Sequence, residues 1–115
     1  MFVLAAVALA LPLLCGNRSV PKWQGSRNTG VSSTVRCARA ELGRFGQIRV
    51  ERGEASEAGK VRLFVTQRQA GKHRTVATIY VNGLQSFSAL WMDAKSYTLG
   101  NSIWLDLTRS CGLRP

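Results

Sequence analysis

The sequence predicts a small all-β domain, a disulfide-bridged sandwich or barrel of about six strands with at most one short helix. Short runs rich in Val, Ile, Phe and Trp follow one another after residue 30, and turn residues such as Gly and Asn separate them. Apolar residues in several of these runs recur at every second position, which is the period of a half-buried strand. Cys37 and Cys111 lie near the two ends of this region, and we expect this even pair to form one disulfide.

Residues 2–14, FVLAAVALALPLL, precede this domain and form an unbroken apolar stretch. A membrane-spanning helix needs about 20 apolar residues, whereas the apolar region of a signal peptide has roughly 7–15. We therefore expect a signal peptide over residues 1–16, an N-terminal extension over 17–30 and a single β-rich domain over 31–115. This organisation describes a secreted protein whose mature chain has no transmembrane segment. A lipoprotein modified on Cys15 is the alternative, but Leu14 is bulkier than the small residue that such a site requires.

Six segments of the domain have the composition or the alternation of β-strands. One of them places Val61, Leu63 and Val65 on one face. The last segment places Ile103, Leu105 and Leu107 on one face. The stretch 38–47 has room for one helical turn before its glycines end it. The expected strands span residues 31–38, 47–52, 61–67, 74–81, 84–92 and 101–111.

The dipeptide Asn82-Gly83 joins two apolar runs and predicts a two-residue type I′ turn, in which both residues have positive φ. In that register Val81 lies opposite Leu84, and apolar side chains fall on both faces of the hairpin. We therefore expect the second face to be covered, as in a sandwich or barrel. The two expected sets are Ile79, Val81 and Leu84 on one face and Tyr80, Phe87 and Trp91 on the other.

The chain is strongly basic, with 16 Lys and Arg against 6 acidic residues and a net charge of +10. Such a charge predicts an anionic macromolecule as partner, either a nucleic acid, an acidic glycan or an acidic protein surface. Arginine dominates the cations and is the side chain that binds phosphate and carboxylate in a fork, although a GC-rich genome produces the same bias.

Many of these cations gather on a hairpin formed by segments 61–67 and 74–81, with QRQAGKHR (67–74) at its tip. Arg62, Phe64 and Arg68 point away from its apolar face, and an aromatic ring between cations is typical of a strand surface that binds nucleic acid. The alternative is that these arginines only solvate the outer face and protect a sheet edge. The candidate binding residues are Lys60, Arg62, Phe64, Arg68, Lys72, His73 and Arg74.

His73 is the only histidine and the candidate around which an acid–base site could be built, although it lies between the cations Lys72 and Arg74. A ribonuclease built around it would need a general base from Glu41 or Glu54 and a phosphate-binding cation from Arg62 or Arg74. A conventional zinc set cannot be assembled from one histidine without a Cys-x-x-Cys pair, and Glu51, Glu54 and Glu57 are too sparse for a calcium loop. We expect no metal and no cofactor.

The plan of the chain resembles small secreted effectors of plant-pathogenic fungi, of the ribonuclease-like or β-sandwich type. The resemblance covers residues 31–112 and rests on a signal peptide, a β-rich body and a disulfide from Val35-Arg36-Cys37 to Ser110-Cys111-Gly112. The aromatic-x-Cys motif of the ribonuclease-like group is Val-x-Cys here. The resemblance implies a virulence protein that binds a host target and has lost catalysis.

The leading hypothesis is a secreted, basic, non-enzymatic binding protein that engages RNA, an acidic glycan or a host protein. A secreted ribonuclease or toxin centred on His73 is one alternative, and a matrix or cell-wall structural protein held to polyanions by its charge is another. Convergence of His73, a glutamate and an arginine on one cleft would favour the ribonuclease.

Overall fold

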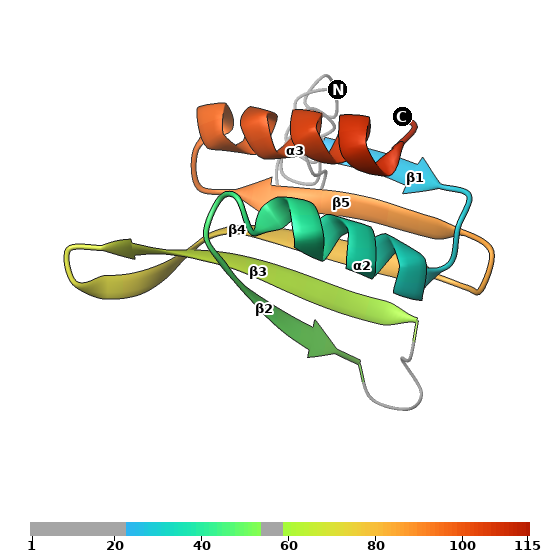
Figure 1. Ribbon diagram of the computed structural model, residues 1–115, viewed down its shortest axis with the longest axis horizontal. Coiled ribbons are helices and arrows are strands. Elements are labelled where there is room, and N and C mark those ends of the chain that lie inside the picture. The colour runs from blue at the N-terminus through green and yellow to red at the C-terminus, as the bar shows by residue number, and fades with distance from the viewer. Residues whose placement is uncertain (1–22, 54–58) are drawn as a thin grey trace, which may run out of the picture.

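A computed structural model describes residues 23–53 and 59–115 of the chain, and the predicted signal peptide, Glu54 and Glu57 lie outside the described residues. Five antiparallel strands form one sheet in the order β1-β5-β4-β3-β2, and both helices lie on the same face of it (Figure 1). The fold is therefore mixed α and β, and the predicted all-β sandwich or barrel is wrong. The elements are β1 (Trp23–Arg27), α2 (Val31–Leu42), β2 (Gln47–Arg52), β3 (Lys60–Gln69), β4 (Lys72–Gly83), β5 (Ser88–Ala94) and α3 (Tyr97–Cys111).

Helix α2 occupies residues 31–38, which we predicted as a strand from their Val and Thr content, so that prediction is wrong. The buried residues of α2 recur every three or four positions, which is the period of one helix face. Burial of this stripe against the sheet outweighs the modest preference of β-branched residues for strands. The stripe consists of Val31, Thr34, Val35, Ala38 and Leu42.

Helix α3 replaces the strand predicted over 101–111, and its ends follow from two residues. The Ser96 hydroxyl accepts a hydrogen bond from the Leu99 backbone N–H at 3.0 Å, which caps the first turn. Gly112 ends the helix in the left-handed conformation, with φ 68°. Ile103 and Leu107 are buried as expected, but Leu105 is 51% exposed because two positions along a helix lie on different sides.

The predicted turn at Asn82-Gly83 is also wrong, because β4 continues through both residues. Gly83 pairs with Ser88, so residues 84–87 form the loop and Val81 lies opposite Leu90. A Cβ atom on Gly83 would lie 2.1 Å from the Phe87 carbonyl oxygen, so this glycine permits a close backbone approach. The tight two-residue turn joins β3 to β4 instead, with φ 52° at Ala70 and 79° at Gly71.

The predicted strands 47–52, 61–67 and 74–81 are confirmed within β2, β3 and β4, and β5 overlaps the predicted strand 84–92. The core lies between the sheet and the helices, where Leu63, Ile79 and Met92 are completely buried. The opposite face of the sheet, which we call the uncovered face, has no helix over it in the described part of the chain (Figure 1). Residues 23–53 and 59–115 therefore form no second layer over this face, in contrast to the predicted sandwich or barrel. β1 lies within residues 17–30, for which no strand is predicted.

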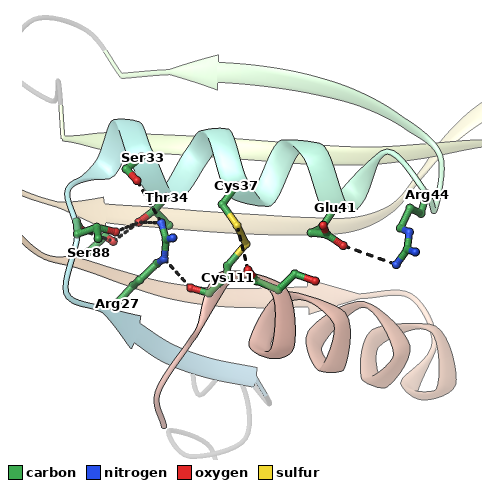
Figure 2. The surroundings of a disulfide bond; sticks show 10 residues. Arg27, Ser33, Thr34, Cys37, Glu41, Arg44, Ser88 and Cys111 are labelled. Atoms are coloured by element: carbon green, nitrogen blue, oxygen red, sulfur yellow. Dashed lines mark hydrogen bonds and ion pairs between the residues drawn. A yellow bond between two sulfur atoms is a disulfide. The ribbon is translucent and has the colours of Figure 1, made fainter.

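The predicted disulfide between Cys37 and Cys111 is confirmed, and it joins α2 to the end of α3 (Figure 2). Next to it, Arg27 of β1 donates hydrogen bonds to the Cys111 carbonyl oxygen and to the Thr34 hydroxyl. The Thr34 and Ser88 hydroxyls are fully buried and lie 2.6 Å apart. These contacts link β1, α2, β5 and α3 beneath the sheet. Neither helix combines the length and apolar character needed to cross a membrane, as judged over the described residues.

Candidate functional site

The uncovered face combines aromatic and charged side chains from four adjacent strands. Tyr80 of β4 lies opposite Arg62 of β3 on one side and Trp91 of β5 on the other. Phe64 of β3 lies opposite Arg49 of β2. Strand register alone therefore places three aromatic rings and two arginines on one surface, because residues that lie opposite each other point to the same face.

The aromatic rings on this face are held by contacts with their neighbours. The Tyr80 and Trp91 rings are stacked, with centroids 5.4 Å apart and planes at 11°. The Arg49 guanidinium carbon lies 4.2 Å from the centroid of Phe64, and that of Arg62 lies 6.0 Å from it. Cation–π attraction thus fixes Phe64 between two positive charges. A ligand that stacks here finds rings that are already ordered.

Two shallow grooves cross the uncovered face, and Trp91 lines both. The first has a volume of about 340 Å³, and its lining includes Tyr80, Trp91 and three cationic residues. The cationic residues are Arg52, Lys60 and Arg62. Strand register places Lys60 and Arg62 on the uncovered face, whereas Arg52 lies opposite the buried Val61 at the end of β2. The second, of about 530 Å³, continues past Trp91 along β1, where Gln24 and Ser26 line it. Together the two grooves form a continuous surface from the cationic residues of β3, across Tyr80 and Trp91, to the polar residues of β1.

Two carboxylates also lie on this face. Burial raises the pKa of Tyr80, and the nearby Asp93 carboxylate raises it further by its charge and by a hydrogen bond, while Arg62 partly opposes the shift. Tyr80 therefore keeps its phenolic proton across the physiological pH range. Glu51 forms ion pairs with Arg62 and with Arg49.

The other predicted binding residues lie on an arm, residues 66–75, formed by the distal ends of β3 and β4. Figure 1 shows this arm extending past the helices. The strand register shifts between Val65 and Thr66, at the point where the arm begins. Arg68 lies opposite His73 and Gln69 lies opposite Lys72, and all four are exposed. The structure thus divides the predicted set: Lys60, Arg62 and Phe64 lie towards the uncovered face, while Arg68, Lys72, His73 and Arg74 lie on the arm.

His73 does not share a cleft with a general base in the described structure. It lines a groove at the base of the arm with Arg44 and Arg68, and no carboxylate lines that groove. Glu41 instead lies 3.6 Å from Arg44, which also contacts Asp106 at 3.1 Å. The arrangement predicted for a ribonuclease is therefore not assembled by the residues described.

Sequence reasoning missed Arg49, Tyr80 and Trp91 as candidate site residues. Tyr80 and Trp91 were expected on a common face, and they are, but that face was expected to be covered. Arg49 alternates with Ile48 and Val50, so its outward direction is readable. Its contact with Phe64 depends on the β2–β3 register, which no local signal supplies.

Among residues 23–53 and 59–115, no group of three or more His, Cys, Asp or Glu side chains is arranged to hold a metal ion. Comparison with known proteins identifies no relative: no family model matches the chain, and neither a curated protein nor a solved structure is significantly similar to it.

Proposed function

We propose that this protein is a secreted, non-enzymatic binding protein whose uncovered face engages single-stranded nucleic acid. The observation that supports it is the set of three half-buried aromatic residues, Phe64, Tyr80 and Trp91, with arginine beside them on a sheet face that no described helix covers. Every base has a π-face, so stacking on aromatic rings binds a single strand with little dependence on sequence. Arginine and lysine next to the rings complement the phosphates.

The arm and the net charge support the same partner. The net charge of +10 raises the rate at which any polyanion meets the protein, and the exposed cations of the arm extend the positive surface along β3 and β4 past the helices. An acidic glycan or an acidic host protein is attracted by the same charges. The aromatic rings separate these partners, because stacking with bases adds affinity that charge alone does not give.

Binding of fluorescein-labelled octauridylate, followed by anisotropy, tests this function. We expect Phe64→Leu and Trp91→Leu each to weaken binding by about 1–3 kcal/mol, the usual contribution of one stacked base. The matched control is Tyr97→Leu, since Tyr97 is an aromatic residue on α3 that is 62% exposed. This control should leave affinity unchanged.

Heparin and octadeoxyuridylate complete the comparison. Heparin affinity should be insensitive to Trp91→Leu, since heparin has no bases to stack, and the DNA oligomer should respond as the RNA does. If heparin and octauridylate lose equal affinity in the face variants, or if Tyr97→Leu weakens binding as much as Trp91→Leu, stacking is not the basis of recognition. His73→Ala should leave octauridylate binding nearly intact, and cleavage of RNA abolished by that change would instead establish the ribonuclease.

A further inference from the structure

Four residues of β2 and β3 form a square on the uncovered face. Arg49 lies opposite Phe64, and Glu51 lies opposite Arg62. Within each strand the two residues are two positions apart, so all four side chains point to the same face. The two arginines occupy one diagonal of the square, and Phe64 and Glu51 occupy the other.

The Glu51 carboxylate binds both arginines, with a different oxygen for each. Its Oε1 atom contacts Nη2 of Arg62, and its Oε2 atom lies 3.6 Å from Nη1 of Arg49. Phe64 contacts the same two guanidinium groups through its ring. The two arginines are therefore already directed at an anion with two oxygens, which is also what the non-bridging oxygens of a phosphodiester present.

We infer that Arg49 and Arg62 form an oxyanion subsite in which Glu51 occupies the position of a ligand phosphate. Glu51 acts as an internal competitor that leaves the arginines when a phosphodiester arrives, while Phe64 keeps both guanidinium groups in place. The identity of the ligand as a nucleic acid rests on the proposed function. The two-arginine subsite itself depends only on the geometry of the square.

Because the square is exposed to solvent, replacement of the Glu51 carboxylate by a ligand phosphate costs little free energy. The side chains of Arg49, Arg62 and Glu51 are 60%, 54% and 41% exposed. Ion pairs with this exposure are weak because water screens them, so a ligand held by several other contacts displaces the carboxylate readily. An isolated small anion lacks those contacts and competes less well. Glu51 thus favours extended polyanions over single phosphate or sulfate ions.

Removal of the competitor is the direct test. Glu51→Gln keeps the size of the side chain and removes its charge, and we expect it to bind octauridylate about two- to tenfold more tightly. The matched control is Asp106→Asn. It changes the net charge by the same amount and releases Arg44 from a similar ion pair on the helical side of the molecule. This control should change octauridylate affinity less than Glu51→Gln does.

Dimethyl phosphate provides a second readout that does not require nucleic-acid binding. Its titration, followed through the Nε–Hε resonances of Arg49 and Arg62, should saturate at lower concentration in Glu51→Gln than in the wild type. In an Arg49→Gln/Arg62→Gln background, Glu51→Gln should no longer increase affinity for octauridylate. Weaker binding by Glu51→Gln, or a gain equal to that of Asp106→Asn, would overturn the inference and make Glu51 a positioning residue. If octauridylate binds no variant while dimethyl phosphate still distinguishes them, the proposed function fails and the subsite stands.

Discussion

At the scale of a single residue, Gly100 determines how closely α3 approaches β1. A Cβ atom at this position would lie 2.3 Å from Cη2 of Trp23. Trp23 is 9% exposed, and its indole N–H donates a hydrogen bond to Asn101 Oδ1 at 2.9 Å. The ring is thus confined on several sides and has little room to move.

We expect Gly100→Ala to lower the free energy of unfolding by about 1–3 kcal/mol, the usual cost of overpacking. Helix propensity alone predicts the opposite, a gain of about 1 kcal/mol. Urea denaturation measures the difference, with Ser102→Ala as a control on an exposed position of the same helix. A variant as stable as the wild type would show that the Trp23 ring shifts freely.

A second prediction at this scale concerns Tyr80, whose pKa is raised by burial and by Asp93 from an ordinary value of 10.0. Tyrosinate absorbance, taken as the difference between the wild type and Tyr80→Phe, should titrate above that pH. Asp93→Asn should shift this titration to lower pH, because it removes the negative charge and its hydrogen bond. A titration that Asp93→Asn does not move would contradict the assigned cause.

The same shift affects stability with a definite sign. Above pH 10 the unfolded chain loses the Tyr80 proton before the folded protein does, so ionisation stabilises the unfolded state first. The free energy of unfolding should therefore be unaffected below that pH and fall as pH rises above it. Tyr80→Phe should show a smaller fall.

At the scale of the elements, the disulfide holds the two helices together over a sequence separation of 74. Chain-entropy arguments assign such a loop about 4–5 kcal/mol, an upper figure because unfolded chains are not random coils. We expect the double variant Cys37→Ser/Cys111→Ser to lose several kcal/mol of stability in urea denaturation. Ser32→Ala and Ser110→Ala, exposed positions on the same helices, serve as controls. Labelling of both thiols in the native protein would rule out the bridge.

The strands could be predicted from the sequence far better than the helices could. β2, β3 and β4 alternate apolar and polar residues, and that pattern is local. The buried stripe of α2 contains Thr34, whose hydroxyl forms a hydrogen bond with that of Ser88 on β5, and the buried residues of α3 include Gly100. Thr34 and Gly100 do not have apolar side chains, so they interrupt the apolar period of three to four residues by which a helix is predicted. Only contacts with other elements, Ser88 and Trp23, account for their burial. Ser96 and Gly112 are residue types that favour the start and the end of a helix, and the predicted strand over 101–111 did not take them into account.

Part of the candidate site could be predicted because strand alternation is also a local pattern. Alternation placed Phe64 and Arg62 on the outer face of β3, and the structure agrees. Tyr80 and Trp91 are accessible to a ligand only because both helices lie on the opposite face of the sheet. A sequence interpretation that assigns the helices as strands cannot identify which face they cover. Contact between Arg49 and Phe64 depends on the register of β2 against β3, which the sequence between the two strands does not reveal.

At the scale of the whole molecule, positive charge is spread over the arm, the uncovered face and the helices, and their contributions to binding can be separated. We expect Arg68→Gln/Lys72→Gln/Arg74→Gln to reduce the salt dependence of octauridylate binding, by about 0.7 in the log–log slope for each phosphate that the variant no longer neutralises. The control is Arg36→Gln/Arg39→Gln/Arg109→Gln, three exposed helical cations with the same change in net charge. Equal reductions in the two triple variants would mean that net charge alone attracts the ligand.

The pairing of Arg114 with Ser26 has a consequence for self-association. Their two backbone hydrogen bonds, 2.7 and 2.8 Å long, add a short rung beside β1, and Pro115 follows without an N–H to continue it. Another chain is thus kept from adding a strand at Ser26 because the pairing positions are already taken. At the opposite edge β2 carries three charged residues, Arg49, Glu51 and Arg52, whose side chains a second strand brought alongside would desolvate. We therefore expect edge-to-edge pairing to be disfavoured by the occupied position at Ser26 on one side and by the charged side chains of β2 on the other.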